Sequence, residues 1–164
     1  VGSPAALTNL ARYTIAAWIK PRTFGEANLG RILNKRSSVG WCLFLTGSGE
    51  AFFRQTFSIT EGAWSTPVNS IALGAWQHVA AAYDNSVAAN RPVFYINGKL
   101  ATTIVRTAPS GAKSSDAAST LSIGNTATLD RTFDGAIDDV RIYNRILSAS
   151  EIGGLATVMP TSSG

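Results

Sequence analysis

Two adjacent carboxylates, Asp138 and Asp139, lie within an otherwise strand-like run near the C-terminus of the 164-residue chain. Aspartate is disfavoured in strands, so the pair suggests a ligand, a cation or a turn contact. Neighbouring residues of a strand point to opposite faces of the sheet. We therefore do not expect these two carboxylates to cooperate in one reaction.

Other catalytic groups are scarce in this chain. A retaining glycoside hydrolase needs two carboxyl groups about 5–5.5 Å apart, but none of the four glutamates has a carboxylate two residues away. Asp134 and Asp138 are evenly spaced, yet Gly135 is expected to turn the chain between them. The single histidine, His78, shares a strand face with apolar and small residues, which favours a satisfied core or boundary position. We expect no catalytic residue, and a glycosidase or lyase is the weakest alternative.

Composition excludes several classes of protein. The formal net charge is +4, and the ten arginines among the fourteen basic residues are scattered, which is not the pattern of a nucleic-acid-binding protein. The one cysteine, Cys42, lies in an apolar run and is expected to be a buried, inert thiol. No run is long and apolar enough to predict membrane insertion.

Short β-like runs recur between turn signals, at the spacing of a sandwich. They predict strands over residues 13–20, 31–36, 41–46, 50–57, 76–84, 93–98, 99–105, 121–125 and 136–144. Asn97-Gly98 is a strong hairpin signal. The sequence therefore predicts an all-β protein, a two-sheet antiparallel jelly-roll sandwich.

The remaining segments complete this expected organisation. Ser148 and Glu151 form a capping box, which predicts one short C-terminal helix that ends at Gly153-Gly154. Residues 107–120 are small and polar, and are expected to form a long mobile loop. We assign residues 1–156 to one domain and residues 157–164 to a flexible tail.

Several of these runs together resemble the laminin-G-like members of the concanavalin A-like lectin/glucanase superfamily. The matching pieces are YTIAAWIK (13–20), ILNK and GWCLFLT (32–46), LGAWQHVAAAYD (73–84), VFYINGK (93–99), LSIGN (121–125) and FDGAIDDVRIYNRILSASEI (133–152). The resemblance implies a jelly roll with one concave and one convex sheet. Residues 1–12 replace the N-terminal strand that relatives carry. That strand is either supplied by preceding sequence in a longer protein or rebuilt differently.

The resemblance also implies a possible metal site. Many relatives bind one Ca²⁺ through backbone carbonyls and an acidic side chain of the "I-D-D-V" segment, and Ca²⁺ prefers such hard oxygen ligands. Asp138 is the leading candidate ligand for one structural Ca²⁺ here, followed by Asp139 and Asp134. The alternative is that one aspartate caps a turn amide while the other pairs with Arg141 or Arg131.

Sugar binding needs exposed aromatic rings beside polar groups, because a ring stacks on the C–H face of a pyranose. Trp18 and Trp76 match framework positions of the family and are expected in the core. Trp41 and Trp64 are less constrained, and Trp64 stands in a loop-like setting. With the polar pair Arg54 and Gln55, they form the candidate ligand-binding set, Trp64, Arg54, Gln55 and Trp41. The alternative role for Trp41 and Trp64 is a core plug at the sandwich edge.

We therefore expect a noncatalytic carbohydrate-binding, lectin-like module of a larger secreted or surface-exposed protein, with a glycan or a cell-surface protein as its partner. The alternative is a protein–protein, adhesion or assembly module of a surface or virion protein. In that case a neighbouring molecule could donate the missing first strand.

Overall fold

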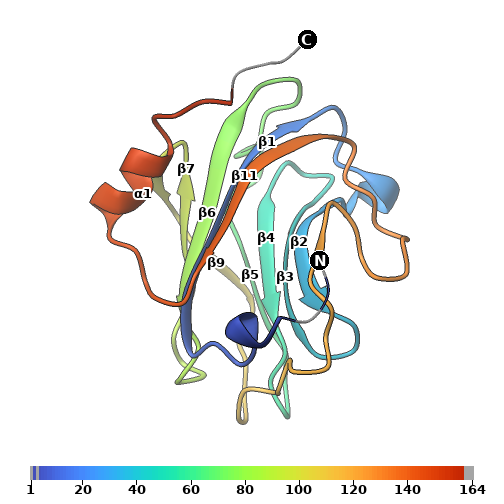
Figure 1. The fold of residues 1–164 in the computed structure, drawn as a ribbon, viewed down its shortest axis with the longest axis vertical. Coiled ribbons are helices and arrows are strands. Elements are labelled where there is room, and N and C mark those ends of the chain that lie inside the picture. Colours follow the sequence, from blue (N-terminus) through green and yellow to red (C-terminus); the bar gives the residue numbers. More distant parts are fainter. Residues whose placement is uncertain (1, 3, 161–164) are drawn as a thin grey trace.

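The computed structural model describes residues 2 and 4–160, which form two packed antiparallel sheets and one α-helix (Figure 1). The elements are η1 (Ala5–Leu7), β1 (Arg12–Pro21), η2 (Glu26–Asn28), β2 (Arg31–Arg36), β3 (Gly40–Leu45), β4 (Ala51–Gln55), β5 (Gly62–Ser65), β6 (Gln77–Asp84), β7 (Val93–Ile96), β8 (Lys99–Ala101), β9 (Ile104–Thr107), β10 (Ser122–Ile123), β11 (Gly135–Tyr143) and α1 (Ala149–Leu155). The predicted all-β, two-sheet sandwich with one short helix is confirmed.

The strands divide between a five-stranded sheet, in the order β11-β1-β6-β7-β8, and a six-stranded sheet, in the order β10-β2-β3-β4-β5-β9. The Asn97-Gly98 turn joins β7 and β8 as predicted, with positive φ at both residues, as a type I′ turn requires. The predicted return strand over 99–105 is wrong in its extent. It stops at Ala101, and the chain then crosses to the other sheet, where β9 pairs with β5.

A layer of aromatic side chains fills the space between the two sheets. Tyr13 stacks on Trp41 with ring centroids 5.6 Å apart, and Trp64 lies 5.2 Å from Tyr83 and 6.2 Å from Phe53. These rings come from β1 and β6 of one sheet and from β3, β4 and β5 of the other. Because interlocking rings bury large areas from both sheets, this layer sets how the sheets pack.

Strand β5 was missed by sequence reasoning because its four residues begin with Gly62 and end with Ser65, and Thr66-Pro67 follow directly. Trp64 pairs with Phe53 of β4 across the ladder and is fully buried. Gly62 makes room for the ring, since a Cβ there would lie 2.7 Å from Cζ3 of Trp64. The glycine that suggested a loop therefore accommodates a core side chain.

The predicted mobile loop over 107–120 is instead held against the sandwich. Asp116 is buried, with its Oδ1 atom 3.2 Å from the Nζ atom of the equally buried Lys35. The same carboxylate accepts a hydrogen bond from the backbone amide of Asn9, at 2.7 Å. Since leaving one member of a buried ion pair alone costs about 3–5 kcal/mol, this contact ties the loop and the N-terminal segment to β2.

Helix α1 covers the outer face of the five-stranded sheet (Figure 1). Ile152 and Leu147 pack with Ala16, Ala80 and Tyr95 of that face. The predicted capping box is present, with the Ser148 side chain bound to the Glu151 amide and the Glu151 side chain bound to the Ser148 amide. The helix passes through Gly153 and Gly154, where we expected it to end, and continues to Leu155, which packs against the same cluster.

The residues after α1 are described as far as Pro160, and Val158 and Met159 are exposed. The last four residues of the predicted tail, 161–164, lie outside the described residues.

His78 lies on this same outer face and is 1% exposed, next to Trp18, whose ring centroid is 5.5 Å away. The expectation of a buried histidine holds, but the expectation that its polar atoms are satisfied does not. Its Nδ1 atom has no hydrogen-bond partner among the described residues. Burial, which disfavours the charged imidazolium, lowers the pKa of His78 to about 4.

The first prediction concerns the room that Gly62 leaves for Trp64. Gly62→Ala should lower the free energy of unfolding by roughly 1–3 kcal/mol, as overpacking a core does, measured by urea denaturation. Gly154→Ala is the matched control, because a Cβ there meets nothing within 4 Å and alanine favours a helix interior by about 0.5–1 kcal/mol. Equal stability of Gly62→Ala and the native protein would contradict this packing.

The second prediction concerns His78 and acid. Its pKa is about 6.5 in an unfolded chain and about 4 in the folded one. Between these values the unfolded state binds more protons, so stability should fall as the pH is lowered through this window. Over this pH window we expect the free energy of unfolding of His78→Gln to fall by roughly 1–3 kcal/mol less than that of the native protein. Urea denaturation at several pH values measures this difference. Parallel pH profiles of the variant and the native protein would refute it.

Candidate functional site

The outer face of the six-stranded sheet carries a cluster of arginines. Side chains alternate along β2, so that Leu33 and Lys35 face the core while Asn34 and Arg36 face outward. Simple alternation would also turn Arg31 inward. A register shift between Arg31 and Leu33 adds one residue to β2, and such a bulge re-aims the side chains before it. Arg31 therefore joins Asn34 and Arg36 on the outer face.

Two phenylalanines form the floor beneath these arginines. Phe44 and Phe52 pair across β3 and β4, with ring centroids 4.9 Å apart. The Cζ atom of Arg31 lies 4.3 Å from the centre of the Phe44 ring, and that of Arg54 lies 5.4 Å from the Phe52 ring. Cation–π attraction and the apolar stems hold both guanidinium groups against the sheet.

Glu61 holds two members of the cluster. Its carboxylate lies 2.5 Å from Nη2 of Arg36 and 3.7 Å from Nη1 of Arg54. Arg31 has no such partner among the described residues. Its Nη1 atom donates instead to the carbonyl of Leu29, at 2.9 Å.

The loop between β10 and β11 forms the wall of a pocket beside these arginines. The Oδ1 atom of Asp130 accepts hydrogen bonds from the hydroxyls of Thr126, at 2.5 Å, and Thr128, at 3.0 Å. These two bonds lower the pKa of Asp130, so its carboxylate stays ionised. Its other oxygen, Oδ2, lies 3.7 Å from Arg131.

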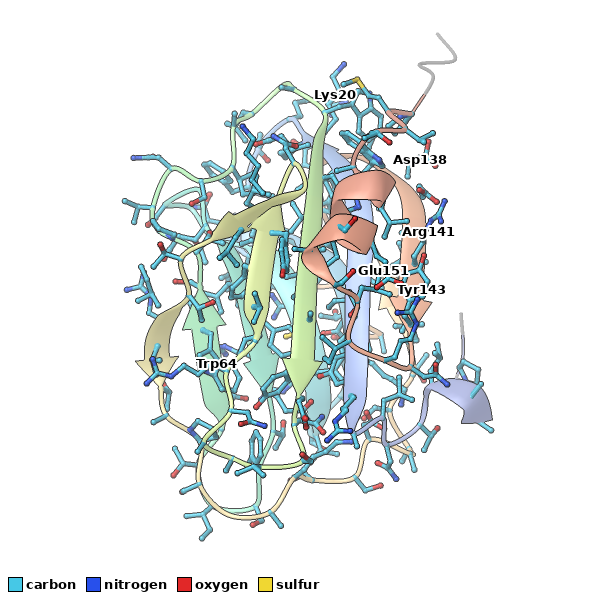
Figure 2. All side chains as sticks on the ribbon, turned by 90° about the vertical axis from the view of Figure 1, so that its left-hand side faces the viewer. Lys20, Trp64, Asp138, Arg141, Tyr143 and Glu151 are labelled. Carbon is cyan, nitrogen blue, oxygen red and sulfur yellow. The ribbon has the colours of Figure 1, made fainter. Side chains whose placement is uncertain are left out.

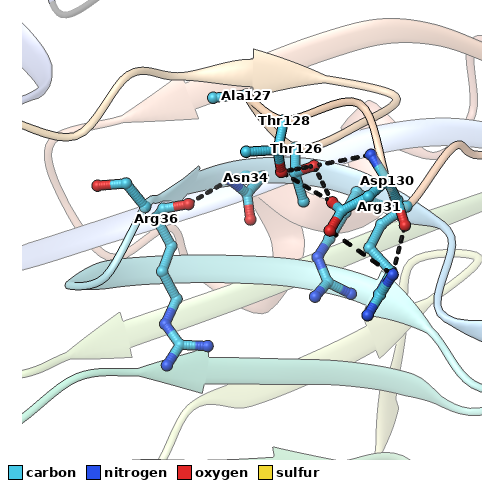
Figure 3. A pocket seen from close by; sticks show the side chains of 9 residues that line it. Arg31, Asn34, Arg36, Thr126, Ala127, Thr128 and Asp130 are labelled. Atoms are coloured by element: carbon cyan, nitrogen blue, oxygen red, sulfur yellow. Dashed lines mark hydrogen bonds and ion pairs between the residues drawn. The ribbon is translucent and has the colours of Figure 1, made fainter.

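The pocket that results has a volume of about 300 Å³ (Figure 3). Its lining residues are Arg31, Asn34, Arg36, Ser37, Thr126, Ala127, Thr128, Asp130 and Arg131. This volume is at the lower end of the range of small-molecule sites, about 300–1,000 Å³. The lining offers guanidinium, amide and hydroxyl groups, which bind hydroxyls or an anion.

Most of the predicted ligand-binding residues lie elsewhere. Trp64, Trp41 and Gln55 are buried between the sheets, at 0–1% exposure, so they cannot stack on or bind a ligand there. Gln55 instead accepts a hydrogen bond from the Tyr13 hydroxyl across the core, at 2.9 Å. Only Arg54 of the predicted set reaches the arginine cluster. The core-plug alternative for the two tryptophans is the one that fits.

Trp76, expected in the core, is only half-buried. It precedes β6 of the five-stranded sheet, on the opposite side of the sandwich from the arginine cluster. Sequence reasoning missed Arg31, Arg36 and the two threonines. The alternation of Asn34 and Arg36 in β2 could have found Arg36, but no local pattern marks Arg31 or the two threonines.

The predicted metal ligands do not converge. A bulge in β11 places both Asp138 and Asp139 between the core-packed Ile137 and Val140, so the expectation that they point to opposite faces is wrong. Asp138 accepts a hydrogen bond from the amide of Asp139, at 2.7 Å, and Asp139 binds Nε of Arg141, at 2.8 Å. Asp138 and Arg141 project from the β11 edge in Figure 2.

Asp134 is also engaged, by Arg22 at 2.8 Å and by the Thr23 hydroxyl at 2.9 Å. Among residues 2 and 4–160, no group of three His, Cys, Asp or Glu side chains could hold a metal ion. These aspartates bind cations and amides of the protein itself, as the alternative reading of the sequence had it. They do not fit a calcium site built on their side chains.

Within the described part of the chain, no helix is long and apolar enough to cross a membrane. Cys42, on the same sheet face as the arginines, is a free and fully buried cysteine. Burial raises the pKa of its thiol, consistent with the inert role expected for it.

Solved structures similar to this chain include several carbohydrate-binding domains. The CBM40 of the Ruminococcus gnavus IT-sialidase bound to α2,3-sialyllactose has a TM-score of 0.68 and 18% identity, over 90% of this chain and 83% of that one. The heptameric SAP-like pentraxin of Limulus polyphemus has a TM-score of 0.61 and 17% identity, over 90% of this chain and 70% of that one.

A third similar structure is the binding domain of Botulinum neurotoxin DC in complex with rat synaptotagmin II. Its TM-score is 0.62 at 18% identity, over 90% of this chain and 36% of that one. At these identities the likeness is one of fold. No curated protein matches the sequence. The family described as the concanavalin A-like lectin/glucanase superfamily matches residues 1–153, and the chain therefore belongs to that family.

Proposed function

We propose that this chain is a noncatalytic carbohydrate-binding module of a larger secreted or surface-exposed protein. Its ligand binds on the outer face of the six-stranded sheet, in the pocket between β2 and the loop from Thr126 to Arg131. The observation that carries the proposal is the lining of that pocket, where hydroxyl, amide and guanidinium groups surround a cavity of about 300 Å³. Carbohydrate-binding structures of similar fold support it.

Two carboxyl groups, those of Asp130 and Glu50, are unsuited to act as the general acid of a glycosidase. A glycosidase needs a general acid whose pKa is raised. The pKa of Asp130 is lowered by the two threonine hydroxyls. That of Glu50 is lowered because hydrogen bonds from Thr46, Ser65 and Arg106 outweigh the effect of burial. Both stay ionised and paired, which suits them to orient neighbouring donors.

A protein-binding role has one observation in its favour. Edge strand β8 presents Leu100, which is 71% exposed, beside Val93 in a shallow pocket of about 450 Å³. This surface is apolar and distant in the fold from the arginine cluster, so the two roles are separable by experiment. Failure to bind any glycan, together with a dimer mass that Leu100→Ser abolishes, would favour this second function.

The glycan-binding proposal predicts a pocket-specific loss. We expect Thr128→Ala to weaken binding of the best ligand from a glycan array by about two- to tenfold, as loss of one hydrogen bond does, measured by calorimetry. Thr102→Ala, an equivalent change in the pocket beside β8, should leave affinity unchanged. Silence across plant, algal and animal glycans would overturn the proposal. Tryptophan fluorescence is a poor readout, since no tryptophan lines the arginine pocket.

A further prediction concerns calcium. Because Asp134, Asp138 and Asp139 bind groups of the protein itself, EDTA should change neither the melting temperature nor the glycan affinity. The melting temperature is measured by differential scanning fluorimetry in EDTA, and again after CaCl₂ is added. A melting temperature that drops in EDTA and recovers with calcium would show that a structural calcium site is present after all.

A further inference from the structure

The arginine cluster holds more positive charge than the carboxylates around it neutralise. Arg31, Arg36, Arg54 and Arg131 stand against two carboxylates, those of Glu61 and Asp130. The Nε atoms of Arg31, Arg36 and Arg54 are buried and have no hydrogen-bond acceptor among the described residues. Buried donors are nearly always satisfied in folded proteins, so the cluster has fewer acceptors than donors.

Arg31 is the least compensated member of the cluster. It is 9% exposed, and no carboxylate lies within ion-pair distance of it among the described residues. Burial lowers the pKa of its guanidinium, and the charges of Arg54, Arg131 and Arg36 lower it further. A buried cation is normally paired, as Lys35 is with Asp116 in the core.

The geometry leaves part of this guanidinium for an anion. Nη1 donates to the carbonyl of Leu29, and the flat face rests on Phe44. Nη2 has no partner among the described residues and, unlike Nε, is not buried, so it is the donor that a carboxylate in the pocket can reach with a charge-assisted hydrogen bond. Arg31 lines the pocket together with Asn34 and Thr128, groups that suit the hydroxyls of a sugar.

Resting on the proposed function, we infer that the pocket selects acidic saccharides, with the sugar's carboxylate bound beside Arg31. The anionic group supplies the missing acceptor and balances the excess charge, and the threonine hydroxyls and Asn34 bind the ring. The carboxylate of Asp130, on the pocket wall, repels the carboxylate of the sugar. Neutral sugars leave Arg31 uncompensated and bind more weakly.

Matched probes test this selectivity. The first set has a common lactose core and compares a carboxylated, a sulfated and a neutral sugar: 3′-sialyllactose, 3′-sulfolactose and lactose. The second set compares trigalacturonic acid with its neutral methyl ester. These are titrated by calorimetry, alongside an array of acidic and neutral pairs. We expect each carboxylated sugar that binds to do so about tenfold or more tightly than its neutral partner, with a salt dependence that the neutral sugar lacks. Preference for the sulfated sugar would overturn the carboxylate assignment.

Variants locate the effect at Arg31. Arg31→Met, which keeps an apolar stem over Phe44, should remove the preference for the acidic sugar. Arg31→Lys should retain part of it, because the charge remains but the guanidinium that rests on Phe44 and presents Nη2 is lost. Arg12→Met is the control, since Arg12 pairs with Asp84 on the other sheet. Unchanged discrimination in Arg31→Met, with far-ultraviolet circular dichroism like that of the native protein, would overturn the inference.

A second variant avoids the buried residue altogether. Asp130 is exposed, and Asp130→Asn removes the opposing charge without changing the core, so the ratio of the affinity for the acidic sugar to that for lactose should rise. The Nε–Hε nuclear magnetic resonance signal of Arg31 should shift with sodium glucuronate but not with glucose. Equal binding of acidic and neutral sugars would refute the inference alone, whereas silence across all glycans would refute the proposed function as well.

Discussion

The aromatic layer between the two sheets is the constraint on which the rest of the structure depends. Tyr13, Trp41, Phe53, Trp64 and Tyr83 interlock with centroid distances of 5.2–6.4 Å. Since this layer occupies the inward positions of the central strands, polar side chains of those strands face outward unless they are bound within the core. Gln55 and Lys35 are such exceptions, and each has its partner.

The two outer faces of the sandwich have different roles because they are covered differently. Helix α1 lies on the five-stranded sheet, where Ile152 packs on Ala16 and Ala80. The small side chains of these strands allow the helix to approach closely. Among the described residues no helix covers the outer face of the six-stranded sheet, and its arginines rest on Phe44 and Phe52. A ligand therefore has a preformed, charged and aromatic-backed surface on that side.

Bulges in two strands decide which charged side chains reach the surface together. In β2 the register shift turns Arg31 outward beside Arg36. In β11 the shift between Asp138 and Arg141 directs Asp139 to Arg141 instead of the core. One extra residue in a strand moves the side chains that precede or follow it to the opposite face of the sheet. The arginine pocket and the ion pair between Asp139 and Arg141 both follow from this effect.

The sequence alone determined the sandwich, most strand positions, the Asn97-Gly98 hairpin and the capping box of α1, because these depend on alternation and on local turn or cap chemistry. It also identified the superfamily. The tertiary structure decided the placement of Trp64, Arg31 and Asp139. Gly62 makes space for a ring from two residues away, and a bulge is set by pairing with a neighbouring strand. Neither leaves a local pattern, so the binding surface emerges only when the strands are paired.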